Sequence, residues 1–598
     1  MCGLIALLGA PDSAFSVETL QPALKHMHRR GPDAEGIWQN PGVWLGHRRL
    51  AIQDLDMRSS QPMHSACGRY VIVFNGEIYN FPALRVDLLA NGVQFRTTSD
   101  TEVLLALFAL EGPAMLPRLR GMFAFVIWDR TTRRAFAARD PYGIKPLYYA
   151  LTPDGVLMAS QVRALLATGL VSRAPCARGQ ATFWLLGSVS EPHTWYQDVK
   201  ALPAGHCAWV DEGRMGTPVC WWDVAAAWRD APATLPSLGE VRERTRAALR
   251  ASVAVHLVAD VPVGVFLSGG IDSGALAGLM VEAGATNLQG ITLAYDEFAG
   301  TNDDEAPLAA QLAAHYGIQH HVRRVSHDEF SADLPRILAA MDQPSVDGIN
   351  TWYATKAVAE LGLKVVVSGV GGDELFQGYR SFKQLPQLVS AWAPVSRLPG
   401  AMPLAQEIMD MQARRSGTAR WRYMPDWART IPGAWWLRRG LYSPAELPAL
   451  MGADLAAEGL QGFSPDAWVG QMSGAIPCVK KLAVGQIEST TYMRNQLLRD
   501  SDWASMDHSV ELRTPLVDAW LLSDLQPMLG AFKQFPNKRL LAEAPAKPLP
   551  EDLITRRKTG FGIPVQKWLE QMGNTSDGVG PSQAWARELV RRYDGGGV

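Results

Sequence analysis

The sequence predicts two successive folds: an α+β layered domain, then an α/β domain built on a doubly wound parallel sheet with helical additions. Short β-like runs separated by turn residues fill the first third of the chain. From residue 261 onward, short apolar runs alternate with helical patterns instead. The length of 598 residues also exceeds what one hydrophobic core usually serves, so at least two domains are expected.

The N-terminal strands are expected to pair with their neighbours in sequence before helices cover them. The runs VWLGHRRLAI, YVIVFNGEIY and MFAFVIWDR, at 43–52, 70–79 and 122–130, are typical of strands bounded by turns. The segment DTEVLLALFAL, at 100–110, has a helical pattern. Hairpins covered by helices predict an α+β layered domain over residues 1–206.

A change in composition separates this domain from the next. Residues 207–237 mix Gly, Pro, Trp and Ala and end in APATLPS, which predicts a linker. In the second domain, predicted at 238–573, buried-type strands alternate with helices, as in a parallel sheet. Residues 380–490 are helical in pattern and rich in Trp and Arg, and 574–598 is predicted to be a loose, Gly-rich tail. The strand-like runs are VPVGVFL (261–267), LQGITLAY (288–295) and KVVVSGV (364–370).

Composition and charge exclude several classes of function. A formal net charge of -2, without a long run of like charge, gives no reason to expect a nucleic-acid partner. The six cysteines show no CxxC spacing, which argues against a disulfide framework or a zinc site and suits a reducing cytosol. No apolar run approaches the roughly 20 residues that span a bilayer. A signal peptide begins with a positively charged region, but here no Lys or Arg precedes Lys25. A cytoplasmic protein without a membrane partner is expected.

The second residue is a candidate nucleophile. Gly3 after Cys2 allows the initiator Met to be removed, which leaves the thiol beside the chain's own α-amino group. An α-amine has a pKa of about 7.7–8.0, so it can accept the thiol proton near neutral pH. Because a cysteine also occurs at this position by chance, the surrounding motifs decide between the two interpretations.

Those motifs supply what hydrolysis of an amide requires. Asn75, Gly76 and Glu77 lie at the end of a predicted strand, where a side-chain amide and a backbone N–H can stabilise an oxyanion. Arg49 follows another strand and can bind an α-carboxylate through two parallel hydrogen bonds. Asp100 precedes a helical pattern and can bind an α-ammonium group. The alternatives are a surface ion pair for Arg49 and an N-cap for Asp100, but together the residues favour the catalytic interpretation.

The N-terminal motifs resemble the class II glutamine amidotransferase domain. They are MCGLIALLG, HRRGPDAEG (28–36), HRRLAIQD (47–54), FNGEIYN (74–80), SDTEVLL (99–105), GMFAF (121–125) and RDPYGIKPLYY (139–149). The resemblance implies the N-terminal-nucleophile fold, with two antiparallel sheets between helix layers. It also implies that Cys2 attacks the glutamine amide and that Asn75 and Gly76 form the oxyanion hole. The implied glutamine-binding residues are Arg49, Leu50, Ala51, Ile52, Gln53, Asn75, Gly76, Glu77 and Asp100.

A glycine-rich turn in the second domain is a candidate nucleotide site. SGGIDS (268–273) follows a strand and precedes a helix, so its backbone N–H groups can form an anion nest. It is too short for a Walker A motif and resembles the pyrophosphate-binding loop of ATP pyrophosphatases. An acid so close to pyrophosphate, Asp272, implies a shielding Mg²⁺. A second turn, SGVGGDELFQGY (368–379), also ends in an acid at a helix start, so Asp272 and Asp373 could share one Mg²⁺–pyrophosphate.

The second domain, apart from parts of 380–490, resembles the synthetase domain of the asparagine synthetase B family. The resemblance continues through DDEAPLAAQLAAHYGIQHH (303–321), LLRDSDWASMDHSVELRTPLVD (497–518) and RRKTGFGIPVQKW (556–568). It implies that Lys558 neutralises phosphate charge during adenylation, the alternative being a lysine at a helix end. A homodimer is a family-level expectation. The implied ATP-binding residues are Leu267, Ser268, Gly269, Gly270, Asp272, Ser273, Leu293, Ser368 and Gly369.

The two resemblances predict a glutamine-dependent amidotransferase. It would hydrolyse glutamine, pass ammonia to a second site and amidate a carboxylate activated as acyl-AMP, converting ATP to AMP and pyrophosphate. Relatives that close β-lactam rings have lost the nucleophile, whereas Cys2 is present here. A non-catalytic scaffold would be expected to lose Cys2, Asp272, Asp373 or Lys558, and all four are present. Aspartate is the default acceptor, and the alternatives are a sugar acid, a secondary metabolite or a peptide.

One residue argues against free aspartate as the best acceptor. In relatives that make asparagine the second turn usually reads SGEGSDE or SGEGADE, whereas here Val370 occupies the position of the acid. A valine can neither accept a proton nor hold a cation, so interactions that set specificity would be lost. In the alternative interpretation Val370 is a packing variant, and Asp342 or Asp347 supplies the charge.

Overall fold

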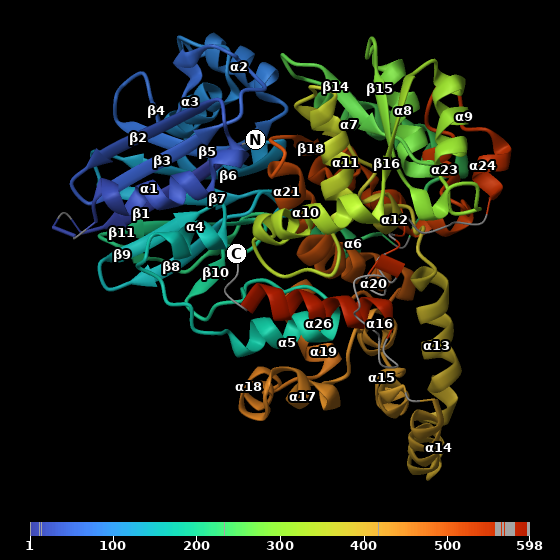
Figure 1. Cartoon of the computed structure of the whole chain (residues 1–598). Helices are drawn as coiled ribbons and strands as arrows, with labels where there is room; N and C mark the ends of the chain where they lie inside the picture. The colour runs from blue at the N-terminus through green and yellow to red at the C-terminus, as the bar shows by residue number, and fades with distance from the viewer. Residues whose placement is uncertain are drawn as a thin grey trace.

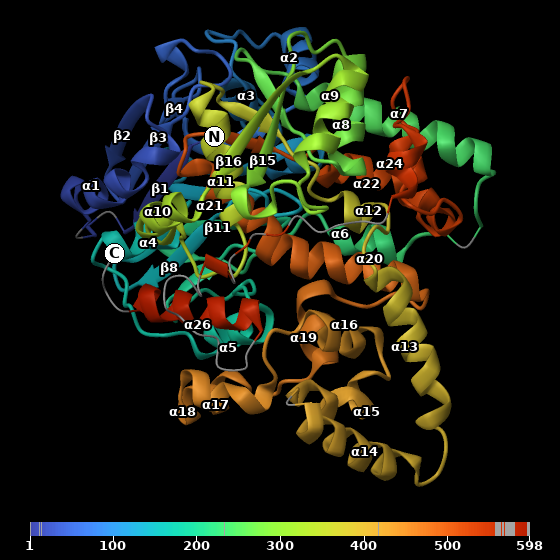
Figure 2. The same cartoon turned by 45° about the vertical axis from the view of Figure 1, so that its right-hand side comes forward.

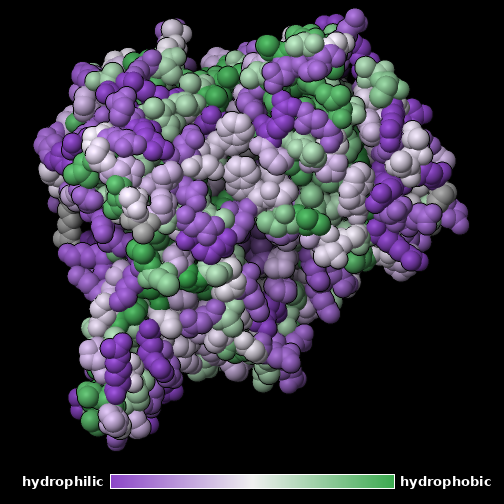
Figure 3. Space-filling view, turned by 180° about the vertical axis from the view of Figure 1, so that it is seen from behind, coloured by the Kyte–Doolittle hydropathy of each residue, from purple (hydrophilic) through white to green (hydrophobic). Residues whose placement is uncertain are grey.

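The computed structural model describes residues 2–10, 12–13, 15–232, 234–416, 418–556, 562, 564, 567–568 and 580–594. The N-terminal strands form one half of the molecule, and the parallel sheet with most of the helices forms the other (Figure 1). Helices α13 (Ser381–Val395) and α14 (Ala401–Ser416) extend from the second half as an arm, which Figure 2 shows from another side. From behind, hydrophilic and hydrophobic residues alternate in small areas over the body and this arm (Figure 3).

The first N-terminal sheet contains six antiparallel strands in the order β10-β8-β9-β1-β3-β2. Strand β1 lies inside the sheet, is buried along its whole length and pairs Gly3 with Arg48 of β3. This arrangement places Cys2 at the start of a central strand. The strands are β1 (Gly3–Gly9), β2 (Ala34–Asn40), β3 (Val43–Arg49), β8 (Tyr148–Thr152), β9 (Gly155–Ala159) and β10 (Val199–Ala201).

The second N-terminal sheet is also antiparallel, in the order β12-β11-β7-β6-β5-β4, with β13 paired to β11. Strand β5 is buried throughout and ends with the oxyanion candidates, because Asn75 and Gly76 pair with Ala124 and Phe123 of β6. The strands are β4 (Met63–His64), β5 (Tyr70–Ile78), β6 (Gly121–Asp129), β7 (Arg134–Arg139), β11 (His206–Asp211), β12 (Arg214–Met215) and β13 (Val219–Cys220).

Three apolar layers hold these sheets and their helices together. One layer, which includes Leu4, Val73 and Val126, lies between the two sheets. Helices α1 (Val17–His26) and α4 (Val162–Ala167) share an apolar cluster with the first sheet, and α2 (Phe81–Ala90) and α3 (Asp100–Glu111) share one with the second. The order helix, sheet, sheet, helix confirms the predicted N-terminal-nucleophile fold.

The second sheet extends further along the chain than the predicted domain boundary. Residues 207–237 were expected to be a linker, but β11 pairs Cys207 with Ala138 of β7, and β12 and β13 pair with β11. Ala208 and Val210 are buried in the layer between the sheets, so the strand belongs to the N-terminal core. The Gly and Pro residues that flank the short strands β12 and β13 give this stretch the mixed composition of a linker. Helices α6 (Val224–Arg229) and α7 (Leu238–His256) follow.

The second half contains the predicted parallel sheet, with five strands in the order β16-β15-β14-β17-β18. The chain moves outward from β14 to β15 and β16, then returns to β17 and β18 on the other side. Ligands of such sheets bind at the carboxyl ends of the strands beside the point where the strand order reverses. Here that point lies between β14 and β17. The strands are β14 (Val263–Phe266), β15 (Gln289–Tyr295), β16 (Gln319–Val325), β17 (Val365–Val367) and β18 (Glu511–Arg513).

A helical region rich in tryptophan packs beside the parallel sheet. Trp436, Phe463 and Trp468 contact one another edge to face, with ring centroids 4.7–5.7 Å apart. A π-helix, η7 (Glu488–Leu498), connects α20 (Lys480–Ile487) to α21 (Arg499–Met506), and α16 (Ile431–Arg439) lies in the same region. None of the helices in the described part of the chain is long and apolar enough to cross a membrane.

The last described segment is a packed helix, α26 (Pro581–Asp594), where the sequence predicted a loose tail at 574–598. Trp585 and Leu589 are buried in the tryptophan-rich cluster, and the Tyr593 hydroxyl donates to the Asp342 carbonyl at 2.9 Å. The helix lies beside α5 (Ala177–Leu186) (Figure 1). Its apolar residues are separated by charged ones, an amphipathic spacing that the Gly-rich flanks obscure in the sequence.

Candidate active sites

The predicted nucleophile and the oxyanion residues lie together. Cys2 is buried, and its backbone N–H donates to the Asn75 Oδ1 atom at 3.0 Å. A Cβ atom at Gly76 would lie 2.1 Å from the Met122 carbonyl oxygen, so only glycine fits beside Asn75. Burial raises the pKa of the Cys2 thiol, which the positive N-terminus and a hydrogen bond from the Leu50 backbone oppose. A thiol that is protonated at neutral pH needs a base, the role predicted for the α-amine.

Arg49 organises the loop that follows it. Its guanidinium donates to the Asp56 carbonyl at 2.9 Å and also to the Asp54 carbonyl, and the side chain is buried. Arg49 is therefore not a surface ion pair. It holds the 50–56 loop beside Cys2, whose thiol it also influences electrostatically.

The same loop contacts the second half of the molecule. Leu50 and Ile52 are buried in an apolar cluster formed mostly by residues of the second half. The Ala51 N–H donates to Asp33 at 2.7 Å, and the Gln53 side chain donates to the Val258 carbonyl at 3.3 Å. The predicted glutamine loop therefore lies at the interface between the two halves.

Two buried acids complete the predicted glutamine pocket. Asp100 accepts a hydrogen bond from the Ile78 N–H at 2.9 Å, and burial raises its pKa to about 6. Ser99, not Asp100, caps helix α3 by accepting from the Glu102 N–H. Burial, together with the charges of Glu511 and Asp100, raises the pKa of Glu77 well above its ordinary value. Clustered acids of this kind favour a cationic group beside them, such as an α-ammonium.

The two predicted nucleotide turns also come together, at the carboxyl ends of β14 and β17. In the first turn, the Ser273 hydroxyl accepts from the Ser268 N–H at 3.0 Å, and the Gly270 N–H donates to Ser268 Oγ at 3.1 Å. A Cβ at Gly369 of the second turn would lie 2.9 Å from Asp272 Cβ, so the turns are in contact. Leu267, directly after β14, and Leu293, in β15, are both buried.

Asp272 and Asp373 both contact Lys538, a residue that the sequence analysis missed. The ammonium nitrogen lies 2.5 Å from a carboxylate oxygen of each acid. Burial disfavours the charge of Lys538, but the two carboxylates outweigh burial and raise its pKa. The lysine has a positive φ of 54° at the start of α23 (Arg539–Ala542). Because it lies more than 160 residues beyond Asp373, roughly the length of a domain, no local motif connects it to the turns.

The acids of the two turns suit a magnesium–nucleotide complex. Oxygens of both carboxylates approach a single cationic nitrogen, so they can also approach one metal ion. Mg²⁺ is commonly held by one or two carboxylates plus substrate phosphates rather than by a complete set of protein ligands. Among the described residues, no group of three or more His, Cys, Asp or Glu is suited to hold a metal ion.

The residues predicted to influence which acceptor is bound lie in different parts of the structure. Val370 is half-buried and packs against the apolar core below the turn. Asp342 accepts from the Val162 and Arg163 N–H groups at 2.8 and 2.9 Å, so it caps α4 of the N-terminal half. Asp347 is half-buried near Arg439, with Gln496 as a hydrogen-bond partner. Lys558 lies outside the described residues.

A buried ion cluster joins the two halves directly beneath Cys2. Arg30 donates from Nε to the Cys2 carbonyl at 3.1 Å and forms two hydrogen bonds to Asp502 of α21, at 2.7 and 3.1 Å. Lys145 approaches the same carboxylate at 3.4 Å. The side chains are at most 5% exposed. The main chain at Cys2, the predicted nucleophile, is therefore connected through Arg30 to a residue of the other half.

Comparisons with known proteins agree with this two-part arrangement. Residues 1–222 match the family model described as a glutamine amidotransferase domain, and residues 244–582 match the one described as asparagine synthase. A putative glutamine-hydrolysing asparagine synthetase of Mycobacterium tuberculosis is 33% identical, over 95% of this chain and 88% of that protein. "Asparagine synthetase [glutamine-hydrolyzing] 1" of Bacillus subtilis is 30% identical, over 99% and 90%. "Amidase chry2" of Gibberella zeae is 28% identical, over 95% and 90%.

An N-terminal-nucleophile domain joined to a parallel-sheet nucleotide domain defines a glutamine-dependent amidotransferase. With matches over most of its length, the chain belongs to the asparagine synthase family. It is an ATP-dependent, glutamine-hydrolysing amidoligase.

Proposed function

We propose that the chain transfers ammonia from glutamine to a carboxylate that it first activates as an acyl-adenylate, and that free aspartate is not its best acceptor. The observation that carries the proposal is the pair of separated sites, with Cys2 and Asn75 in one half and Asp272 and Asp373 in the other. Ammonia made at the first site is consumed at the second.

At the first site, the Cys2 thiolate attacks the glutamine amide carbon. The Asn75 side-chain amide and the Gly76 N–H stabilise the resulting oxyanion, and Glu77 and Asp100 bind the α-ammonium group. The α-amine of Cys2 takes the thiol proton and returns it to the departing ammonia. Water then hydrolyses the thioester to release glutamate.

At the second site, a carboxylate oxygen of the acceptor attacks the α-phosphorus of ATP, and pyrophosphate leaves. The turns at 268–273 and 368–373 bind the phosphates, and Lys538 and Lys558 neutralise their charge. Bound Mg²⁺, held by Asp272 and Asp373, would shield these acids from pyrophosphate. Ammonia attacks the acyl carbon, and AMP leaves.

Two observations support an acceptor other than aspartate. Val370 packs against apolar residues where relatives that make asparagine usually carry an acid, so no charge is available there. Asp342 is occupied as a cap of α4, which removes one of the two candidate replacements. Among similar proteins, two are named amidases rather than asparagine synthetases.

The test supplies the purified protein with glutamine, ATP, Mg²⁺ and aspartate. Asparagine is measured by chromatography, and nucleotide products by phosphorus NMR. We expect little asparagine, whereas formation at about 1–10³ s⁻¹, the usual enzyme range, would contradict the acceptor proposal. With an effective acceptor we expect AMP and pyrophosphate, so ADP and phosphate would contradict adenylation.

A further inference from the structure

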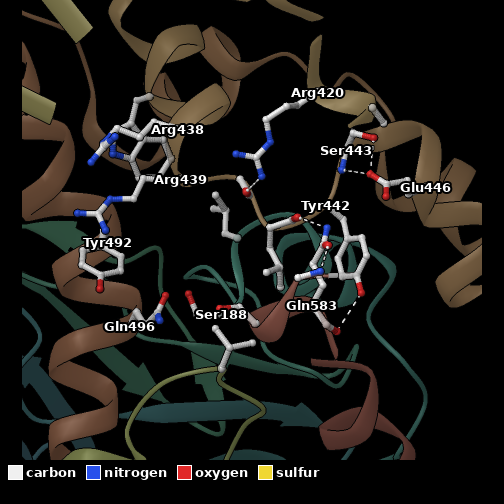
Figure 4. A pocket seen from close by; sticks show the side chains of 18 of the residues that line it. Ser188, Arg420, Arg438, Arg439, Tyr442, Ser443, Glu446, Tyr492, Gln496 and Gln583 are labelled. Carbon is white, nitrogen blue, oxygen red and sulfur yellow. Dashed lines mark hydrogen bonds between the residues drawn. The ribbon is translucent and has the colours of Figure 1, made fainter. Parts of the chain in front are cut away.

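A cavity of about 590 Å³ lies between the tryptophan-rich helical region and the N-terminal half. Its walls include Tyr492 and Gln496 of the π-helix, Arg438 and Arg439 at the end of α16, and Tyr442 in the following loop (Figure 4). The volume falls within the roughly 300–1,000 Å³ of sites for small organic ligands. Free aspartate would leave most of this space unfilled. π-Helical turns are rare and frequently occur at functional sites.

The cavity has an excess of positive charge. Among the described residues, neither Arg420 nor Arg438 forms an ion pair with a carboxylate. Arg420 donates to the carbonyls of Leu437 and Gly440 at 3.2 and 2.8 Å, and Arg438 donates to the Gln384 side chain at 2.6 Å.

The acid in the wall does not offset this charge. Glu446 accepts from the Ser443 N–H and hydroxyl at 2.8 and 2.6 Å, so it is used locally (Figure 4). Burial and the neighbouring charge of Arg439 lower the pKa of Arg438, against the opposing charge of Glu488, which pairs with Arg439 at 3.0 Å; Arg438 itself is exposed at the rim. A bound anion would relieve this repulsion between like charges.

Side-chain contacts connect the cavity to the acid-bearing turn. The Arg439 guanidinium lies 3.8 Å from the Tyr492 ring centroid and 4.7 Å from that of Tyr379. The Tyr379 hydroxyl donates to Glu374 at 2.8 Å, and Glu374 follows Asp373 directly. Tyr492, Arg439 and Tyr379 therefore connect the cavity wall to the residue beside Asp373. An acceptor whose body occupies the cavity has to extend past these side chains to reach the second turn.

We propose that this cavity binds the body of the acceptor and that the acceptor carries a second anionic group, which Arg420 and Arg438 bind away from the carboxylate that is activated. The acceptor class is an organic diacid larger than aspartate. The inference rests on the proposed function, because it assigns the acceptor of that second site. Arginine suits the task because its planar fork binds carboxylate and phosphate oxygens in pairs.

The test uses straight-chain dicarboxylates from succinate to sebacate, each compared with the monocarboxylate of the same chain length. Pyrophosphate release is measured with the full-length protein, ATP, Mg²⁺ and glutamine, and binding is measured separately by calorimetry without ATP. The variants are Arg438→Gln and Arg420→Gln. Arg397→Gln is the matched control, because Arg397 is exposed between α13 and α14 and does not line the cavity.

We expect the longer dicarboxylates to bind and react better than their monocarboxylate partners. Arg438→Gln should remove this preference, lowering dicarboxylate kcat/KM by about tenfold or more, as for a lost hydrogen bond to a charged group. Monocarboxylate turnover and the Arg397→Gln control should not change. Arg420 also donates hydrogen bonds to carbonyls at the end of α16, so Arg420→Gln could destabilise the fold. A thermal melt of this variant therefore distinguishes loss of folding from loss of binding.

Two outcomes overturn the inference: no dicarboxylate preference at any chain length, or equal losses for both members of each pair. If the dicarboxylates bind in an Arg438-dependent way and yet no pyrophosphate forms with any acceptor, the cavity assignment stands and the proposed function fails. If pyrophosphate is released with aspartate but the longer dicarboxylates show no preference, the cavity assignment fails and the proposal of another acceptor fails with it, whereas adenylation of a carboxylate stands.

Discussion

The ion cluster beneath Cys2 allows a direct test of whether a residue of the second half influences the glutaminase site of the first. Asp502→Asn keeps the shape of the side chain but removes the charge that pairs with Arg30 and Lys145. Arg30 also donates to the Cys2 carbonyl, so a change in the second half should reach the nucleophile in the first. We expect this variant to lose stability and glutaminase activity together.

The magnitude follows from burial. Arg30, Lys145 and Asp502 have side chains at most 5% exposed, so loss of the carboxylate leaves two cations in a site with little solvent. Removing one partner of a buried ion pair typically costs about 3–5 kcal/mol. The retained amide oxygen can still accept one hydrogen bond, so we expect a loss of about 3 kcal/mol. Misplacement of a catalytic group by about 1 Å can cost about 10²-fold in rate, and a comparable fall in glutaminase kcat is expected.

Asp518→Asn is the matched control. Asp518 pairs with Arg120 across the same interface, with Arg120 Nε 2.8 Å from the carboxylate, and both side chains are at most 10% exposed. Both variants should unfold at lower urea concentration, but only Asp502→Asn should slow glutamate release from glutamine. Equal glutaminase losses in the two variants would refute the link through Arg30. Unchanged stability in both would refute the energetic argument.

The same pair predicts a pH dependence of stability. Burial alone would raise the pKa of Asp502, but Arg30 and Lys145 outweigh burial and hold the pKa below its ordinary value. A carboxyl group whose pKa is depressed by folding contributes stability above its unfolded pKa of about 3.9. That contribution is lost as the pH falls through the folded pKa. Urea midpoints measured through the acid range should fall less steeply for Asp502→Asn than for the parent.

Three further predictions test the individual sites. Cys2→Ala should abolish glutamine-dependent amidation while activity with added ammonium salt persists, since the nucleophile serves only the first site; equal loss of both activities in a folded variant would contradict two sites. Asp272→Asn or Asp373→Asn should lower Mg²⁺-dependent pyrophosphate release by about 10²-fold or more, comparable to the loss of one oxyanion donor, and leave part of the glutaminase activity; a full rate would exclude the acid from the metal site. Val370→Glu should increase asparagine formation from aspartate above a nearly silent parent, measured by chromatography, and no gain would favour the packing interpretation.

The local motifs predicted most of the fold and many contacts of the candidate sites. Glycine adopts backbone conformations that other residues avoid and is therefore typical of tight turns, so the sequence alone places SGGIDS and SGVGGDE at strand ends. Their meeting at the β14–β17 switch point follows from the parallel order of the strands. Similarly, the FNGE motif ends a buried strand whose neighbour is fixed by a hairpin.

Long-range partners could not be predicted in this way. Lys538 reaches Asp272 and Asp373 from a distant turn, and its positive φ is not typical of lysine, so neither spacing nor propensity indicates it. The linker expected at 207–237 includes strand β11, because Gly and Pro residues flank its short partner strands and give this stretch the composition of a linker. In both cases tertiary contacts, which a single sequence does not display, decide the outcome.

Strand β18 links the two candidate sites by contacts of different kinds. The Arg513 carbonyl accepts from the Ser368 N–H at 2.8 Å, so the main chain of β18 positions the second nucleotide turn. The Arg513 side chain donates to the Val258 carbonyl at 2.8 Å, and the same carbonyl accepts from Gln53 of the predicted glutamine loop. Arg513 and its ion-pair partner Glu511 are fully buried, so the side-chain contact cannot be broken without exposing a charge or leaving it unpaired. One short strand therefore contacts both candidate sites, which favours a rigid link between glutamine and nucleotide binding over a flexible one.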